Sequence, residues 1–188
     1  DIARNCISRL GFEDCVIYLL DERRNMLVQK AAFGDKSPHD FEIANPIEIP
    51  LGKGITGAAA KIGKTIRVND TSKDDRYIVD DEVRHSELCV PIIHDGKMIG
   101  IIDSEHPRKN FFTLEQKKTL EQIAGICSSK IARTMALEAM QLAERKLADL
   151  NNKMMEAKFM NLRLQMNPHF LFNTLTSIQY LVVSGQVN

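Results

Sequence analysis

The chain has 188 residues, 44% of them hydrophobic, which is enough for one core of about 130 residues followed by an extended helical tail. The chain has 25 Lys and Arg residues and 25 Asp and Glu residues, so its formal net charge is zero. The composition therefore gives no indication of nucleic acid or an anionic membrane as a partner. No apolar run reaches the roughly 18 residues of a membrane span, and no signal peptide is visible. Because the chain begins at Asp1, we expect it to be a cytoplasmic segment cut from a longer protein, in which membrane segments could lie upstream.

The amino-terminal part predicts an amphipathic helix followed by two paired strands. The helical start ends at Gly11. Cys15–Leu20 and Met26–Phe33 are runs rich in apolar and β-branched residues, and the polar segment Asp21–Asn25 joins them. We therefore expect a hairpin built from these two runs.

A glycine-rich segment, Gly52–Gly57, has the spacing of a dinucleotide-binding fingerprint, and Asp70 stands near the position of a ribose-binding carboxylate. The strand before the glycines carries Pro50, unlike a buried parallel strand, and the helix after them ends at Gly63 within about two turns. A Rossmann crossover needs a longer helix than that. The segment therefore predicts a tight turn and a short helix rather than a dinucleotide site.

Two further strands flank the strongest turn signal of the chain. Leu88–His94 and Lys97–Asp103 surround Asp95 and Gly96, a dipeptide typical of two-residue hairpins. This arrangement predicts antiparallel pairing. After it, Thr113 and Gln116 have the spacing of a capping box that opens a helix.

The motifs of residues 1–131 resemble those of the GAF domain family. The matching segments are the turn, helix and strand at 52–70, then Arg84–Pro91 and Ile99–Ser104. The resemblance implies a central antiparallel sheet with helices packed on one side and a small-molecule pocket on the other. It places four residues at the pocket cover, although each is equally typical of a solvated loop: Arg76, Tyr77, His85 and Glu87. The ligand of such a pocket is unknown from the sequence.

The cysteines and histidines predict neither a metal site nor a redox centre. The cysteines lie far apart among apolar neighbours and are typical of reduced core residues: Cys6, Cys15, Cys89 and Cys127. GAF-type methionine sulfoxide reductases are an enzyme alternative, but they need several cysteines around the second hairpin, where only Cys89 stands. The histidines outside the tail are dispersed, so we expect no metal site: His39, His85, His94 and His106.

The helix that opens after Thr113 meets no proline before Pro168, so we expect it to run on into the tail. From Ala136 onward apolar residues recur at alternating steps of four and three, with charges of both signs on the flanks, as in a left-handed coiled coil. The seam comprises Ala136, Met140, Ala143, Leu147, Leu150, Met154, Ala157, Asn161, Leu164, Pro168, Leu171, Leu175, Ile178 and Val182. This pattern predicts a parallel homodimer.

Within the same helical pattern, the run Asn167–Asn173 reads Asn-Pro-His-Phe-Leu-Phe-Asn, with Gln165 before it and Leu175 and Ile178 after it. It closely resembles the phospho-acceptor segment of LytS-type sensor histidine kinases. The family implies that His169 takes the γ-phosphoryl group of ATP and passes it to an aspartate of a response regulator. The chemistry suits a neutral imidazole, whose free lone pair can attack phosphorus at cytoplasmic pH.

Two neighbours of His169 are further candidates. Many histidine kinases carry an acidic residue directly after the acceptor, whereas Phe170 stands here, so the general base is unassigned. Asn173 lies one helical turn on, where its amide oxygen could orient the imidazole, although a helix-surface asparagine without a role fits equally well. Pro168 predicts a hinge just before His169, the alternative being a proline that the helix bundle straightens.

Together these patterns predict an α+β fold with a GAF sensor domain at 1–131, a coiled-coil signalling helix at 132–164 and a truncated phospho-acceptor and dimerisation segment at 165–188, the first helix of a bundle. We expect the sensor and phospho-acceptor portion of a two-component sensor histidine kinase, with ATP bound by a domain absent from these residues, so that the segment alone is inactive. Its expected partners are a second copy, a response regulator and a small-molecule effector. The alternative is a non-catalytic GAF small-molecule-binding and dimerisation module.

Overall fold

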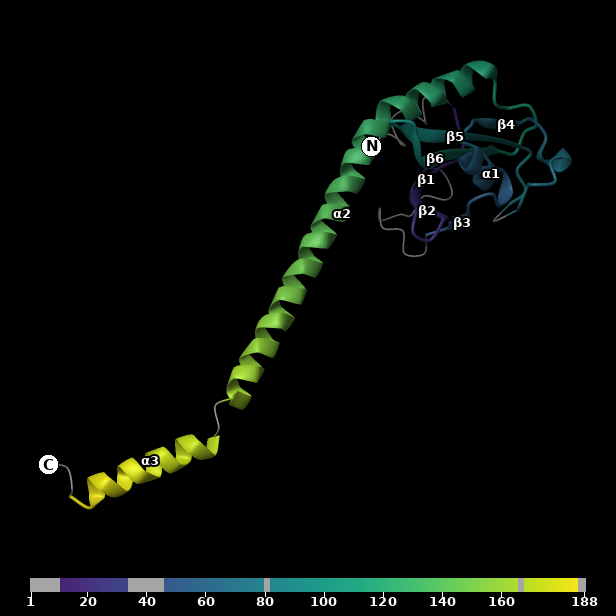
Figure 1. The fold of residues 1–188 in the computed structure, drawn as a ribbon. Helices are drawn as coiled ribbons and strands as arrows, with labels where there is room; N and C mark the ends of the chain where they lie inside the picture. The colour runs from purple at the N-terminus through teal and green to yellow at the C-terminus, as the bar shows by residue number, and fades with distance from the viewer. Residues whose placement is uncertain (1–10, 34–45, 80–81, 166–167, 186–188) are drawn as a thin grey trace. The chain divides into compact units, whose positions relative to one another are not determined.

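The computed structural model describes residues 11–33, 46–79, 82–165 and 168–185 (Figure 1). The helix expected before Gly11 lies outside these ranges. In chain order the elements are β1 (Cys15–Asp21), β2 (Met26–Phe33), β3 (Glu48–Pro50), α1 (Gly54–Ile62), β4 (Ile66–Val68), β5 (Ser86–His94), β6 (Lys97–His106), α2 (Leu114–Gln165) and α3 (Pro168–Val183). The chain divides into two compact units, Asp1–Met135 and Ala136–Asn188, which are described separately.

The first unit is built on a six-stranded sheet in the order β3-β2-β1-β6-β5-β4 (Figure 1). Every pair of neighbouring strands is antiparallel. Both predicted hairpins, β1–β2 and β5–β6, are present. At the second turn Asp95 and Gly96 have φ values of 48° and 75°, the left-handed backbone that a two-residue hairpin turn of this type requires. The predicted antiparallel sheet is therefore confirmed.

Each face of the sheet carries its own apolar cluster, because side chains along a strand alternate between faces. On one face Leu88, Val90 and Ile92 of β5 pack with Leu120 and Ala124 of α2. The opposite face holds the second cluster, in which α1 covers the sheet: Val16, Tyr18, Leu27, Ile55, Ala59, Ala60, Val68, Cys89 and Ile101. The resemblance implied helices on one side only. The structure differs, because α1 presents small residues that lie close against the second face.

The glycine-rich segment forms the turn between β3 and α1. Gly54 has a φ of 71°, and a Cβ on Gly57 would lie 2.6 Å from the carbonyl oxygen of Pro50. The glycine spacing thus follows from a left-handed backbone and a close approach of the chain to itself. Since β3 pairs antiparallel with β2 and α1 has only nine residues, the rejection of a Rossmann crossover is confirmed.

The helix predicted after Thr113 begins at Leu114 and continues to Gln165, a length of 52 residues. Its capping box is formed: Gln116 N donates to Thr113 Oγ1 at 3.1 Å, and Thr113 N donates to Gln116 Oε1 at 2.8 Å. These two bonds satisfy backbone groups that an uncapped helix start leaves unpaired.

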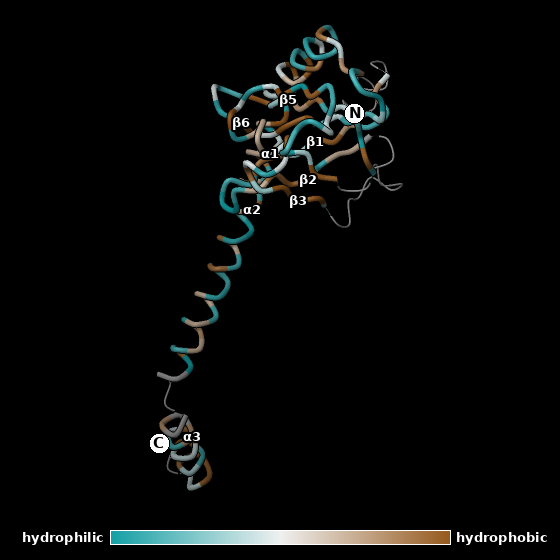
Figure 2. Tube along the Cα trace, turned by 90° about the vertical axis from the view of Figure 1, so that its right-hand side faces the viewer, coloured by the Kyte–Doolittle hydropathy of each residue, from teal (hydrophilic) through white to brown (hydrophobic). Residues whose placement is uncertain are grey.

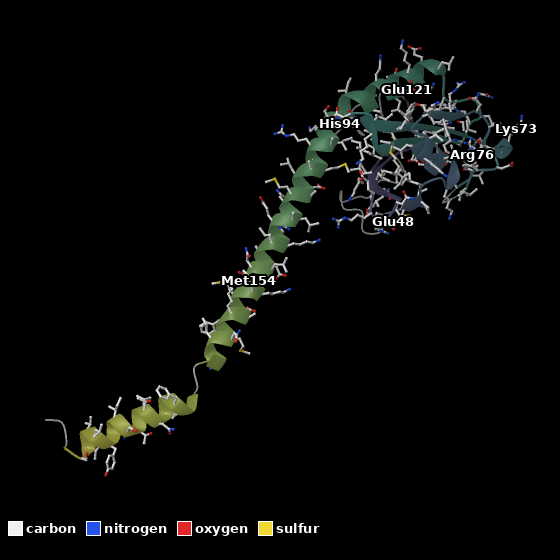
Figure 3. All side chains as sticks on the ribbon, in the orientation of Figure 1. Glu48, Lys73, Arg76, His94, Glu121 and Met154 are labelled. Atoms are coloured by element: carbon white, nitrogen blue, oxygen red, sulfur yellow. The ribbon has the colours of Figure 1, made fainter. Side chains whose placement is uncertain are left out.

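The second unit consists of the remainder of α2 and of α3. Apolar residues recur along it (Figure 2), and the described side chains of the predicted seam are exposed in the single chain. Leu147 is 64% exposed and Leu150 is 63% exposed, while Met154 stands on the surface of α2 (Figure 3). Among the described residues, no helix has both the length and the apolar character needed to cross a bilayer.

Candidate functional site

A cavity of about 200 Å³ lies in the first unit between α1 and the strands β3, β5 and β6. Its walls are mainly apolar, and charged residues stand at both its edge and its floor. Lining residues are Tyr18, Ile47, Glu48, Ile49, Pro50, Lys53, Gly54, Ile55, Thr56, Ile78, Glu87, Asp103 and Glu105. Glu48 on β3, labelled in Figure 3, pairs with Arg24. A concave, mostly apolar site with a few converging polar groups is the usual form of a small-molecule site.

Three carboxyl groups meet at this cavity because of the register of β5 and β6. Glu87 lies directly opposite Glu105, and Cys89 lies directly opposite Asp103. Residues two apart on a strand share a face, so all four side chains belong to the α1 side of the sheet. The acids are nearly inaccessible: Glu87 is 4% exposed, Asp103 is 7% and Glu105 is 8%.

Two neutral donors sit between the acids. Thr56 Oγ1 lies 2.9 Å from Asp103 Oδ2 and 3.2 Å from Glu87 Oε1. Cys89 Sγ lies 3.1 Å from Glu87 Oε1 and 3.3 Å from Asp103 Oδ1. Each donor has one proton and therefore serves one carboxyl group at a time. Thr56 is the link from α1 to the sheet at this point.

Burial and like charges shift the proton equilibria of this cluster. Burial, followed by the charge of Asp103, raises the pKa of Glu87 well above its ordinary value of 4.5. Burial, together with the charges of Asp103 and Glu87, also raises the pKa of the Cys89 thiol well above its ordinary value. The thiol therefore keeps its proton and acts as a hydrogen-bond donor rather than as a nucleophile.

One atom each of Glu87, Cys89 and Asp103 lies within 4.8 Å of the others, a spacing that could hold a metal ion. The sequence analysis did not predict this trio. Its expectation of no metal site was based on the wide spacing of the histidines and cysteines along the chain. Metal binding by cysteine requires the thiolate, whereas the Cys89 thiol keeps its proton and donates it to either Glu87 or Asp103. Cys15 and Cys127 are buried as well, and Cys15 packs in the cluster on the opposite face.

Replacing Glu87 by glutamine is expected to stabilise the first unit at neutral and alkaline pH. The raised pKa means that the folded state holds the Glu87 proton more tightly than the unfolded chain does. The resulting stabilisation is complete below the ordinary value of about 4.5 and is lost as the pH rises through the raised value. Glu87→Gln removes this loss and should raise the Tm at pH 8 by about 2–4 °C for each kcal/mol recovered.

Thermal unfolding from pH 4 to pH 9 measures this effect as the difference in Tm between the variant and the native chain. The same change on the exposed surface of α2, Glu138→Gln, serves as the control and should follow the native curve. A difference in Tm that does not grow with pH would contradict the assigned cause.

Of the four residues expected at the pocket cover, only Glu87 lines the cavity. Arg76, labelled in Figure 3, donates from Nε and Nη2 to the two carboxylate oxygens of Asp74 at 2.8 and 2.7 Å, and it lines a separate polar hollow. Tyr77 Oη accepts a hydrogen bond from Arg84 N at 2.7 Å. Sequence reasoning missed Asp103, Glu105 and Thr56, which the fold brings to the same place.

The predicted phospho-acceptor residues lie in the second unit. Pro168 is the first residue of α3 and His169 the second, but the side chains of both lie outside the described residues. Residues 166 and 167, between α2 and α3, are also outside them. Asn173 is exposed on α3, and its carbonyl oxygen accepts a hydrogen bond from Ser177 Oγ at 2.8 Å. The imidazole-orienting role of Asn173 and the hinge at Pro168 stay predictions.

The family model described as GAF domain matches residues 1–132, which is most of the chain. The chain belongs to the GAF domain family. A solved GAF domain from an Acinetobacter phosphoenolpyruvate-protein phosphotransferase superposes with a TM-score of 0.62 at 22% identity, over 72% of this chain and 80% of that one. This likeness shows the fold. The predicted GAF architecture, with its long carboxyl-terminal helix, is therefore confirmed.

The carboxyl-terminal segment, residues 157–188, matches the histidine kinase family model. The sensor protein LytS of Oceanobacillus iheyensis is 30% identical over 133 residues, which cover 71% of this chain and 21% of that protein. The resemblance to LytS-type sensor histidine kinases is thus confirmed, since a GAF domain match is followed by a histidine kinase match on the same chain.

Another relative is the free methionine-R-sulfoxide reductase of Saccharomyces cerevisiae, 39% identical over 79 residues, which cover 42% of this chain and 44% of the enzyme. The chain spans about half the length, or less, of the curated relatives it matches.

Proposed function

We propose that this chain is the sensor and phospho-acceptor portion of a two-component histidine kinase that autophosphorylates on His169 from ATP and passes the phosphoryl group to a response-regulator aspartate. The observation that carries the proposal is the histidine kinase match at residues 157–188, which contains the Asn167–Asn173 run. A neutral imidazole supplies the lone pair for in-line attack, and the transferred group leaves ADP behind. Because ATP and response regulators are cytoplasmic, we assign the chain to the cytoplasm.

Dimerisation through the seam of α2 is part of the proposal. The exposed apolar side chains of Leu147, Leu150 and Met154 support it, since a helix outside a core gains little from apolar residues at a four-three spacing unless a second helix covers them. Asn161 falls at a seam position, where pairing with its copy in a second chain fixes the register. The second copy would supply the partner helix.

The decisive experiment supplies a LytS-type kinase ATP-binding domain in trans to the 188-residue chain with γ-labelled ATP. We expect label on this chain that is lost in acid and stable in base, as a phosphohistidine is, and no label without the added domain. Addition of the response regulator should then transfer the labelled phosphoryl group from this chain to the regulator. Absence of acid-labile label would instead favour a non-catalytic GAF module that binds a small molecule and dimerises, for which the acid-lined cavity is the supporting observation.

Pro168 is proposed as the compliant point between the signalling helix and the acceptor. A proline inside a continuous helix removes one backbone hydrogen bond and clashes with the preceding turn. A proline at the start of a helix, where Pro168 stands in α3, does neither. In the full-length kinase, Pro168→Ala should stiffen this joint and reduce the ratio of autophosphorylation rates between signalled and unsignalled states. An unchanged ratio would mean that Pro168 only shapes the surface around His169.

A further inference from the structure

The polar hollow that Arg76 lines is a separate feature of the first unit. It has a volume of about 470 Å³ and lies beside β4, the strand that forms one edge of the sheet. Its walls come from β4, from the short 3-10 turn Thr71–Lys73 with the residues around it, and from Asn110 in the connection between β6 and α2. It shares no lining residue with the acid-lined cavity, so the two are distinct.

Both carboxylates of the hollow already have a cation of their own. Asp74 binds the guanidinium of Arg76 through its two oxygens. Asp70 accepts a hydrogen bond from Ser72 Oγ at 2.6 Å and one from Lys109 Nζ at 2.9 Å. The bonds from Ser72 and then from Lys109 lower the pKa of Asp70 to about 2, so its carboxylate is ionised at neutral pH. Neither acid therefore needs a further cation.

Two cations of the hollow are left over after this pairing. Lys73 Nζ lies 3.7 Å from Asp70 Oδ2, an oxygen that already accepts from Lys109. Arg67 has no carboxylate partner among the described residues, where its one hydrogen bond runs from Nη1 to the carbonyl oxygen of Phe112 at 2.7 Å. A guanidinium has five N–H donors, so most of those of Arg67 have no protein partner in this part of the chain. The hollow thus carries an excess of positive charge.

The protein holds these donors in place. Arg67 stands on β4, paired with Leu88 of β5, and its bond to Phe112 fixes the guanidinium. Asn110 N donates to the carbonyl oxygen of Asn69 at 2.8 Å, which joins two walls of the hollow. The side-chain amides of these two asparagines make no hydrogen bond within the described residues and add neutral donors. Donors that are ordered before binding reduce its entropic cost.

We propose that this hollow binds a phosphate group, either inorganic phosphate or the phosphate of a small monoester, with Arg67 and Lys73 as the charged donors and Asn110 as a neutral one. The planar fork of a guanidinium matches two oxygens of a phosphate, and a dianion matches two cations that lack a carboxylate of their own. A carboxylate has a single charge and only two oxygens, so it fits less well. The proposal is independent of phosphoryl transfer to His169.

Isothermal titration of the 188-residue chain with sodium phosphate tests the proposal at about pH 8, where phosphate is mainly a dianion, with sodium chloride holding the ionic strength constant. We expect phosphate to bind at millimolar concentration. Arg67→Gln should weaken this binding about tenfold, a difference of about 1.4 kcal/mol. Lys73→Gln should weaken it less, because this lysine is a flexible point charge. Arg133→Gln, which removes one exposed guanidinium of α2, should bind as the native chain does.

Glycerol 3-phosphate distinguishes the two sources of the group. Affinity equal to that of inorganic phosphate supports a site for a monoester, whereas weaker binding supports a site for the free ion. Thermal unfolding first establishes that each variant is folded, and Lys73→Gln leaves the bond between Arg67 and Phe112 intact if Arg67→Gln is not. Three results would overturn the proposal: no heat of binding with either phosphate, unchanged affinity in both hollow variants, and an equal loss of affinity in Arg133→Gln.

Discussion

Replacing His169 by glutamine is expected to remove all phosphoryl label from the chain without changing its dimerisation. Glutamine keeps a similar length and hydrogen-bonding capacity, but its amide nitrogen has no free lone pair to attack phosphorus. His169 is the only histidine after residue 135, so no neighbouring imidazole in the second unit can take its place. Removal of a nucleophile typically lowers a rate by on the order of 10³-fold or more.

The measurement is label incorporation in the assay with the ATP-binding domain in trans, together with sedimentation of the variant. His94 provides a matched control, because it lies in the first unit beside the β5–β6 turn and contacts Asp95 at 3.5 Å (Figure 3). His94→Gln should incorporate as much label as the native chain. Label retained by His169→Gln and lost by another histidine variant would move the acceptor elsewhere.

Local signals in the sequence were sufficient for most elements of the first unit. The Asp95-Gly96 turn fixes the β5–β6 hairpin by its backbone preference alone, and the Thr113–Gln116 capping box marks the start of α2 by two short-range hydrogen bonds. Such features depend on residues within a few positions of one another. They can therefore be read from a single sequence without knowledge of the packing.

The candidate cavity depends instead on a register shift that the turn does not encode. A regular ladder from the pair His94–Lys97 would place Cys89 opposite Ile102, but a shift between Ile92 and Ile93 places it opposite Asp103. Because a slip of one residue moves side chains to the other face, this shift decides that Asp103 meets Glu87. The available signal is Gly100, an isolated strand glycine of the kind that marks bulges; a Cβ there would lie 2.5 Å from Tyr18 O.

Sequence periodicity predicts α2 as a helix with an apolar seam, and the helix is confirmed over residues 114–165. The pairing of two such helices takes place between two chains. Periodicity can indicate this contact, but the structure of a single chain does not include it. For the acceptor the limit is different, because the side chains of Pro168 and His169 lie outside the described residues. Their roles rest on the motif and on the family resemblance that carries it.

Changing Leu147 and Leu150 together to lysine is expected to convert the proposed dimer into monomers while the GAF core stays folded. Fully burying a leucine contributes about 1.5–3 kcal/mol, and a symmetric dimer loses this at four positions, so the dissociation constant should rise by on the order of 10³-fold or more. Lysine also brings like charges together at the seam. Formation of the proposed dimer should depend on concentration, because Ala136, Ala143 and Ala157 would bury little area in its seam.

Sedimentation at several concentrations measures the dimer, and circular dichroism reports whether the sheet is retained. Ala148→Lys with Asn152→Lys is the matched control, because it adds the same two charges to exposed positions of α2 outside the seam. That variant should remain dimeric. Monomers in both variants would mean that charge alone separates the chains, and dimers in both would place the contact on the GAF unit. If only the variant at Leu147 and Leu150 is monomeric, the dimer contact lies in the seam of α2. In that case α2 can carry a change from the GAF unit to the paired acceptor helices.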